Sequence, residues 1–389
     1  MVEKFILALA CLRGRRGEFI LSNSKGNYMG RYYKNSIFWT INSNEDFSQE
    51  NFNKWESKIE DIDRIQINSS LHEISQSNLQ ELYKRLFQKR KSLHLRIYGY
   101  NKQDLSLLTN FIELESLSIE SSEQILNMGF LANFKKLDEL HLVCDNQESF
   151  DFLWDINSSL KKLSIATYSK KKTNLDITPI SNFKELKYLY LKEYNKSIEA
   201  AISPLVELET LALRSISKPK NLDFISHLSN LKDLIIQSCS FENITAISKL
   251  PNIRYLQLWK LAKINDINVV SLLSNLQHIF VETLNGVEKF PEVSNLSKLR
   301  RIKIVSCKNL RDFSSIEKSQ SLTDFIIQNA KNSNIDDFIP ILMNPNIKDL
   351  GIGYEKVSIQ KKVSELAAKY NKILKTYMYP QFDSEFEYE

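Results

Sequence analysis

Aromatic and basic side chains gather between residues 186 and 303, at spacings that suit recognition of another protein. Tyrosine, tryptophan and phenylalanine alternate there with leucine and isoleucine, and arginine and lysine stand beside them. Aromatic rings offer a large contact area with few torsions to freeze, and arginine adds a charge that orients a partner. The candidate binding residues are Tyr188, Tyr190, Lys192, Arg214, Arg254, Tyr255, Trp259, His278, Phe280, Arg301 and Lys303.

The same residues admit two other interpretations. In one, the rings pack on one another or on a terminal cap and face no partner. In the other, basic and aromatic side chains together bind single-stranded nucleic acid. Against nucleic acid, Asp233, Glu282 and Asp324 share the surface and interrupt a continuous positive groove. We therefore expect a protein partner, with no nucleic acid and no membrane.

Motifs for catalysis or metal binding are missing from the sequence. It has only nine glycines, and it contains neither a phosphate-binding loop, a G-x-G-x-x-G turn nor a G-x-S-x-G elbow. His141 and Cys144 are close in sequence, but two candidates do not make a four-ligand zinc site. Carboxylates such as Glu139 and Asp349 fit a solvated face better than an acid–base pair. We expect no enzyme activity, no cofactor and no metal.

A repeated unit, L-x-x-L-x-L with isoleucine, valine or phenylalanine allowed for leucine, must position the candidate residues. Successive clear units are separated by steps of 22 to 26 residues, and weaker copies begin at Ser92 and Ile62. Internal repetition at such a period is typical of stacked solenoids. The clear units begin at Leu114, Leu137, Leu160, Leu186, Leu208, Leu231, Ile253, Leu276, Leu299, Leu322 and Ile347.

The spacing within each unit predicts its local structure. Apolar residues two apart, such as Leu211 and Leu213, suit a short strand with one face on a core. The wider spacing that follows, as at Ile216, Leu222 and Ile225, suits a short helix or 3₁₀ turn. One coil cannot bury its own apolar face, so stability comes from stacking. Residues at the third, fifth and seventh positions then point away from the core.

These units resemble the leucine-rich repeat, in the short 22-residue form seen in internalins, well over residues 92–354 and loosely over 62–91. The resemblance implies an α/β solenoid with a curved parallel β-sheet on its concave face and short helices or 3₁₀ turns on its convex face. The asparagine ladder usual at the ninth position is missing, so turn backbone groups must find other partners. That position holds Asp145, Tyr168, Tyr194, Ile216, Cys239, Leu261, Leu284, Cys307 and Ala330.

Three regions are expected along the chain. Residues 1–60 form a β-rich N-terminal cap, with strands such as "SIFWTI", and they carry the tightest basic grouping, from Arg13 to Lys34. Residues 61–354 form the solenoid, with a helix over 77–90. Residues 355–389 form a C-terminal capping helix over 357–377 and an acidic tail, "FDSEFEYE", which we expect to fray.

The compartment is expected to be the cytoplasm. The apolar run from Phe5 to Cys11 is short, and the arginines that follow it disfavour export. No stretch approaches 18 apolar residues, so no transmembrane helix is expected. Cys239 and Cys307 hold the same position three units apart, roughly 14 Å at the spacing of stacked strands. That separation exceeds disulfide reach, so we expect the cysteines to be reduced and buried.

These observations favour a soluble, non-catalytic protein that grips a partner protein, alone or as a 1:1 complex. We expect binding itself to be the output, as in a bacterial immunity protein that neutralises a cognate toxin. The composition, rich in lysine, asparagine and isoleucine, is typical of AT-rich bacterial genomes. The alternatives are a secreted or surface internalin-like adhesin or effector, and an intracellular regulatory adaptor. The sequence leaves open the identity of the partner, the organism, and whether the basic N-terminal cap takes part in binding.

Overall fold

The computed structural model describes residues 38–168, 174–329, 332–354, 356–375 and 386–388. The chain divides into a first unit, Met1–Lys170 with Met378–Glu387, and a second unit, Lys171–Tyr377 with Tyr388–Glu389. Most of the expected N-terminal cap, including the basic grouping from Arg13 to Lys34, lies outside the described residues.

In the described part of the first unit, six strands run parallel in sequence order. Each strand pairs in register with the next, and β4 (Gln103–Asp104) pairs separately with β6 (Ile125–Leu126). The six strands are β1 (Phe38–Ile41), β2 (Arg64–Ile67), β3 (His94–Gly99), β5 (Ser116–Ser121), β7 (Glu139–Cys144) and β8 (Lys162–Ala166).

Short helices connect these strands. The segment expected to be helical over 77–90 forms α4 (Gln76–Leu82) and a π-helical turn, η4 (Tyr83–Phe87), so the helix ends earlier than expected. The other connections are η2 (Asn44–Asp46), α3 (Gln49–Ser57), η3 (Leu71–Glu73), η5 (Leu105–Phe111), η6 (Met128–Asn133) and η7 (Asp151–Trp154).

The first described strand already belongs to the repeat sheet. β1, from the "SIFWTI" segment, pairs in parallel with β2, and Trp39 stacks 5.9 Å from Trp55 of α3, measured between ring centroids. Ser48 begins α3 because its side chain accepts a hydrogen bond from the Asn51 backbone N–H, 3.2 Å away. From Phe38 onward, residues expected in the cap therefore have the architecture of a repeat.

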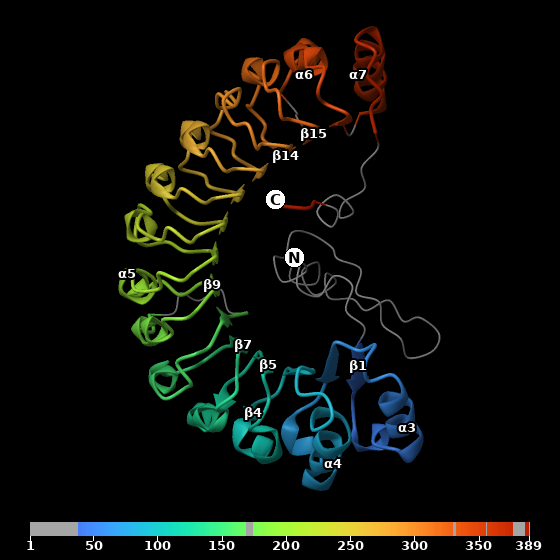
Figure 1. Cartoon of the computed structure of the whole chain (residues 1–389), viewed down its shortest axis with the longest axis vertical. Coiled ribbons are helices and arrows are strands. Elements are labelled where there is room, and N and C mark those ends of the chain that lie inside the picture. The colour runs from blue at the N-terminus through green and yellow to red at the C-terminus, as the bar shows by residue number, and fades with distance from the viewer. Residues whose placement is uncertain (1–37, 169–173, 330–331, 355, 376–385, 389) are drawn as a thin grey trace. The chain divides into compact units, whose positions relative to one another are not determined.

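Among the described residues of the second unit are eight parallel strands, each paired in register with the next. They line the inner side of a curved stack, and the helical turns line its outer side (Figure 1). The strands are β9 (Tyr188–Lys192), β10 (Thr210–Arg214), β11 (Asp233–Gln237), β12 (Tyr255–Trp259), β13 (His278–Glu282), β14 (Arg301–Val305), β15 (Asp324–Gln328) and β16 (Asp349–Gly353).

The described helical segments of the second unit are short turns of three to five residues and one longer helix, α7 (Val357–Lys369), of 13 residues. α7 buries Val363 and Ala367 at the end of the stack and is shorter than the expected 357–377. The other turns are η8 (Thr178–Asn182), α5 (Ile198–Ile202), η9 (Asp223–Ile225), η10 (Thr245–Lys249), η11 (Asn268–Leu272), η12 (Ser314–Ile316), η13 (Ile335–Phe338) and α6 (Ile339–Met343).

The leucine positions form the core, as the spacing predicts. In the unit that begins at Leu208, the strand covers the third to seventh positions, and Leu208, Leu211 and Leu213 are all fully buried. Burying one such side chain is worth about 1.5–3 kcal/mol. The expected leucine-rich-repeat solenoid is confirmed in its sheet, its register and its short outer turns.

A backbone ladder takes the place of the missing asparagines in the second unit. In the seven repeats that begin at Leu186 to Leu322, the eighth residue has a left-handed conformation, with φ between 53° and 72°. Its N–H donates to the carbonyl of the seventh residue in the next repeat, as from Thr283 to Val305 at 2.9 Å. The column consists of Glu193, Ser215, Ser238, Lys260, Thr283, Ser306 and Asn329. The turn groups thus find backbone partners, because the left-handed residue redirects its N–H along the stack.

Three cysteines are described, Cys144, Cys239 and Cys307, and all are buried. Burial raises the pKa of the Cys239 thiol to about 12, so this thiol stays protonated and packs as a small apolar group. No helix within the described ranges is long and apolar enough to cross a membrane.

Candidate functional site

All eleven predicted binding residues lie in the second unit and on one face of its sheet. Ten occupy third, fifth or seventh positions of β9, β10, β12, β13 and β14, and Arg254 immediately precedes β12. Side chains alternate across a strand, so these positions point away from the leucine core. We call this surface the inner face: the outward-pointing residues of β9 to β16, together with Arg254.

The expectation that these rings are exposed is wrong for four of them. Tyr188, Tyr190, Tyr255 and Phe280 are buried, between 3% and 8% exposed, and His278 is fully buried. Arg301 and Lys303 are also buried, whereas Lys192, Arg214, Arg254 and Trp259 are half-buried. The direction of the side chains is as expected, but in the folded chain most of the inner face is covered.

Part of this burial comes from neighbouring strands. The Lys303 ammonium lies 4.7 Å from the centre of the Phe280 ring, and the Arg214 guanidinium lies 5.7 Å from the Trp259 ring. Both are cation–π distances. Tyr255 packs edge-on against His278 with ring centroids 5.0 Å apart. Adjacent strands thus pair Phe280 with Lys303 and Tyr255 with His278. Arg214 of β10 and Trp259 of β12 instead meet across β11.

Polar neighbours hold Arg254 and Tyr255 in fixed orientations. Arg254 Nε donates to Asp233 Oδ1 at 3.1 Å, and the Tyr255 hydroxyl donates to Gln257 Oε1 at 2.9 Å. Asp233 and Gln257 were not among the predicted binding residues. Their position on the same face was visible in the sequence, but hydrogen bonding between columns depends on the strand register.

Tyr388, at the end of the tail, also lies on this face. Its ring centre is 4.7 Å from the Arg254 guanidinium carbon and 6.4 Å from the centre of the Tyr255 ring, at an interplanar angle of 78°. The expectation that residues 382–389 fray is therefore wrong for Tyr388. The signal in the sequence was the acidic and aromatic composition of this segment, which complements a basic and aromatic surface.

The first unit holds a buried ion pair that sequence reasoning missed. Arg96 donates to both carboxylate oxygens of Glu120, at 2.6 and 2.9 Å, and the Tyr168 hydroxyl donates to Glu120 at 3.1 Å. Burial alone would raise the pKa of Glu120, but the Arg96 charge and hydrogen bonds lower it to about 2. Arg96 and Glu120 are diagonal neighbours on β3 and β5, so the opposite charges in adjacent repeats were the available signal.

Two histidines flank this pair. His94 contacts the hydroxyls of Ser116 at 2.5 Å and Ser118 at 2.8 Å, and burial together with the Arg64 charge lowers its pKa to about 3. Burial lowers the pKa of His141 to about 4, despite the nearby Glu120 carboxylate. Both rings are therefore neutral at pH 7. Among the residues that the structure describes, no three His, Cys, Asp or Glu side chains group as metal ligands.

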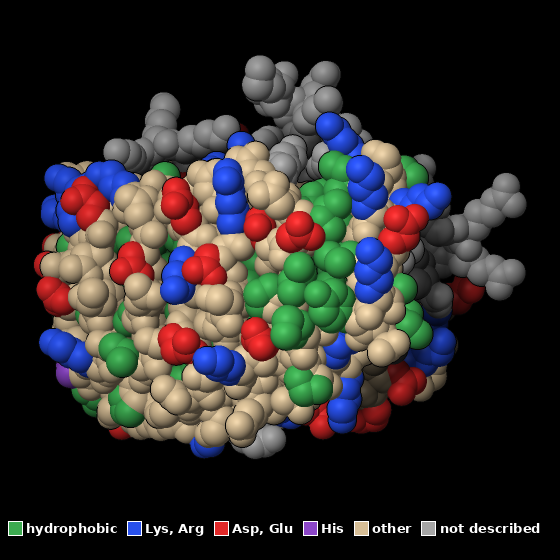
Figure 2. Space-filling view, turned by 90° about the horizontal axis from the view of Figure 1, so that it is seen from above, with side chains coloured by type: hydrophobic (Ala, Val, Ile, Leu, Met, Phe, Trp, Pro, Cys, Tyr) green, Lys and Arg blue, Asp and Glu red, His purple; other side chains and the backbone are tan. Residues whose placement is uncertain are grey.

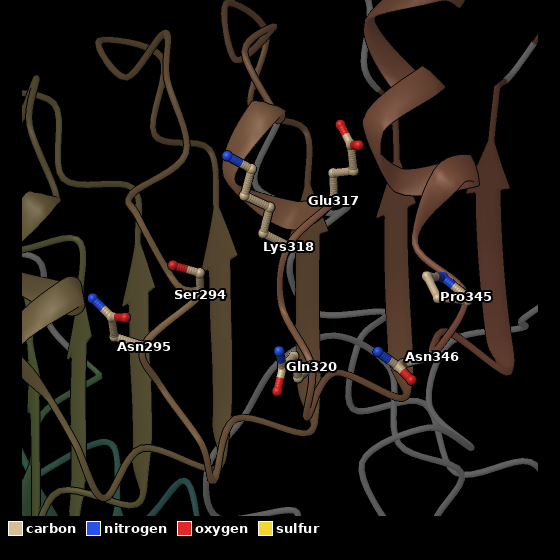
Figure 3. Close-up of a pocket in the computed structure, with 7 residues that line it drawn as sticks. All are labelled: Ser294, Asn295, Glu317, Lys318, Gln320, Pro345 and Asn346. Carbon is tan, nitrogen blue, oxygen red and sulfur yellow. The ribbon is translucent and has the colours of Figure 1, made fainter.

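A surface pocket on the connecting segments is a weaker candidate. Its polar lining comes from three neighbouring repeats and spreads over their loops (Figure 3): Ser294, Asn295, Glu317, Lys318, Gln320, Pro345 and Asn346. In the surface view, charges of both signs are scattered among neutral side chains around one hydrophobic patch (Figure 2). Neither feature matches the organised contacts of the inner face.

Comparisons with known proteins support the fold. No protein-family model and no curated protein matches the sequence. A chain of the Toll–Spätzle complex from Drosophila is similar over 80% of this chain and 42% of its own length, with 11% identity and a TM-score of 0.50. An internalin from Listeria monocytogenes covers 75% of this chain and 87% of its own, with 18% identity and a TM-score of 0.49. A leucine-rich-repeat protein from Leptospira interrogans covers 76% and 91%, with 17% identity and a TM-score of 0.35. At such identities the likeness concerns the fold alone.

Proposed function

We propose that this protein is a non-catalytic recognition module that binds a partner protein on the inner face of its second unit. The observation that carries the proposal is the fixed array of aromatic and arginine side chains there. Arg254 is held by Asp233, and Arg214 lies against Trp259. Tyrosine, tryptophan and arginine are the residues that most often dominate binding energy in protein interfaces. The inner surface of a solenoid is also the one that such proteins commonly present to partners.

The finer proposal is a bacterial immunity protein of the antitoxin type, cytoplasmic and monomeric or in a 1:1 complex, with repeats of the short internalin-like type. Its support is the mixed-charge aromatic face, which suits tight coverage of one partner, and the composition typical of AT-rich bacterial genomes. An internalin-like adhesin or effector and an intracellular regulatory adaptor would use the same face. They differ in what binding does to the partner.

The test begins with affinity capture from the native host and identification of the bound protein by mass spectrometry. The affinity of the purified partner is then measured for Trp259→Ala and Tyr190→Ala variants. Each is expected to weaken binding by about 1–4 kcal/mol, the range of interface hot spots. The matched control is Trp154→Ala, because Trp154 lies in η7 of the first unit and is 48% exposed.

Unchanged affinity in both inner-face variants would contradict binding at this surface. The immunity role is tested by a second experiment on the captured partner. The partner should be toxic when it is expressed alone and harmless when it is co-expressed with the unaltered chain. Co-expression with Trp259→Ala should restore part of the toxicity. A partner that harms no cell would contradict the immunity role and leave the adhesin or the adaptor.

A further inference from the structure

Tyr388 occupies a defined position between two side chains of the inner face. The flat guanidinium group of Arg254 covers its ring at 4.7 Å, and the ring of Tyr255 meets it at a steep angle of 78°. Offset or edge-to-face rings and a cation over a ring are both favourable arrangements. We call Arg254 and Tyr255 the aromatic seat.

Other residues of the second unit build the aromatic seat independently of Tyr388. Asp233, with its side chain only 12% exposed, accepts a hydrogen bond from Arg254 Nε and so holds the guanidinium whose carbon lies over the Tyr388 ring. Gln257 Oε1 accepts a hydrogen bond from the Tyr255 hydroxyl, and His278 packs against the Tyr255 ring. The seat is thus preorganised, which lowers the entropic cost of receiving a ring.

The charge of the surrounding face favours carboxylates beside that ring. On β9 to β14, the outward positions carry Lys192, Arg214, Arg301 and Lys303 against Asp233 and Glu282, and Arg254 adds a further positive charge. Tyr388 lies in the sequence E-F-E-Y-E, where glutamate residues flank both aromatic residues. An acidic aromatic segment therefore complements this face in charge, and its tyrosine contacts Arg254 and Tyr255.

We propose that the aromatic seat is a recognition subsite for an aromatic residue flanked by carboxylates in a partner protein. Tyr388 fills the seat in the free chain, and a partner segment of the same chemistry displaces it. This inference rests on the proposed function and deepens it, because it states which partner chemistry the inner face selects. It also makes the tail an intramolecular competitor, so the partner binds less tightly than an unoccupied seat would allow.

The experiment uses a fluorescently labelled synthetic peptide, SEFEYE, with the sequence of residues 384–389. Its binding is measured by anisotropy against the full chain and against full-length chains carrying Tyr388→Ala alone, with Arg254→Ala, or with Arg311→Ala. Arg311 is exposed and remote from the seat in sequence, so it controls for loss of one positive charge. Circular dichroism spectra and melting curves establish that every variant is folded.

The peptide is expected to bind the Tyr388→Ala chain about tenfold more tightly than the unaltered chain, because the resident tyrosine no longer competes. Adding Arg254→Ala should weaken binding about tenfold, and adding Arg311→Ala should leave it within about twofold. A peptide with alanine for tyrosine, SEFEAE, should bind about tenfold more weakly than SEFEYE. The neutral peptide SQFQYQ should lose about threefold or more.

Equal binding to the Tyr388→Ala chain with and without Arg254→Ala would overturn the subsite, as would no binding to any chain. Equal binding to the unaltered and Tyr388→Ala chains would overturn the displacement by the tail. Equal binding of SQFQYQ and SEFEYE would overturn the selection for carboxylates. If Trp259→Ala weakens binding of the captured partner but SEFEYE binds no chain, this inference alone is wrong. If SEFEYE binds as expected but the inner-face substitutions leave the affinity of the captured partner unchanged, the proposed function alone is wrong.

Discussion

The Arg254 guanidinium carbon lies 4.7 Å from the ring centre of Tyr388, although the two residues belong to distant parts of the sequence. The contact places a tail residue on the inner face, the surface that the repeat pattern predicts for binding. Arg254 is oriented for this contact by Asp233, whose carboxylate also accepts a hydrogen bond from Thr210 at 3.4 Å. The aromatic seat thus depends on β10, β11 and the start of β12. The support that Asp233 gives to Arg254 can be tested by substitution.

Asp233→Asn is expected to weaken binding of the SEFEYE peptide to the Tyr388→Ala chain by about fivefold, on the order of 1 kcal/mol for a charged hydrogen bond. The amide keeps the size of the side chain but loses the charge that fixes Arg254. Fluorescence anisotropy measures the effect. Asp324→Asn is the matched control, because Asp324 lies 3.8 Å from Arg301 on the same face. A larger loss in Asp324→Asn than in Asp233→Asn would contradict the assigned support.

Leu211→Ala should lower the free energy of unfolding by about 2–5 kcal/mol, because it truncates a fully buried side chain in the shared core. Chemical denaturation followed by circular dichroism measures the loss. Arg214→Ala on the same strand removes a half-buried side chain that points to the other face, and it should cost about 1 kcal/mol or less. Equal stability of the two variants would contradict the register of β10.

Thr283→Asn should raise the free energy of unfolding by about 0.5–1 kcal/mol. Thr283 has φ of 56°, a left-handed conformation that is strained for a β-branched residue and better tolerated by asparagine. The backbone hydrogen bond to Val305 remains, since it uses only the main chain. Melting temperatures are compared with those of Thr109→Asn, at an exposed position without positive φ. If the two substitutions shift the melting temperature equally, strain at the eighth position is not the cause.

The free energy of unfolding should fall as the pH is lowered from about 6.5 toward 5. The reason is that histidines protonate in the unfolded chain but stay neutral where they are buried in the folded chain, so protons stabilise the unfolded state. Burial lowers the pKa of His141 to about 4 and that of His94 to about 3, so the unfolded state binds more protons throughout this window. Each histidine contributes at most about 1.4 kcal/mol per pH unit.

His141→Asn should reduce this pH dependence. Urea denaturation at pH 7 and pH 5 measures the difference in unfolding free energy for the unaltered and variant chains. The carboxylate of Glu120 and the guanidinium of Arg96 face the same cluster, but both stay charged between pH 6.5 and pH 5. The pKa of Glu120 is about 2. Burial lowers the pKa of Arg96, but the charge and hydrogen bonds of Glu120 together outweigh that effect and leave this pKa raised. An identical pH dependence in the two chains would contradict a neutral buried His141.

The repeat unit by itself determined the fold and the direction of each side chain. Leucines at fixed positions must share one buried face, and a period of two within each strand then sends Tyr255 and Trp259 to the other face. The same spacing identified the strands, and the resemblance to leucine-rich repeats implied their parallel stacking and the need for a substitute for the asparagine ladder. These features follow from local spacing, because each repeat contacts mainly its neighbours.

Only the tertiary structure decided how the inner face is covered and which side chains meet on it. The pairing of Arg254 with Tyr388 joins a strand to a tail that carries no repeat, so no period relates them. The Arg96–Glu120 pair depends on which residues lie diagonally once β3 and β5 are aligned. The left-handed eighth position likewise appears only when stacked carbonyls are in place to receive its N–H. Local spacing fixes the face of the sheet on which a residue lies. The side chain that it contacts on that face depends on the alignment of neighbouring strands and on segments from distant parts of the sequence.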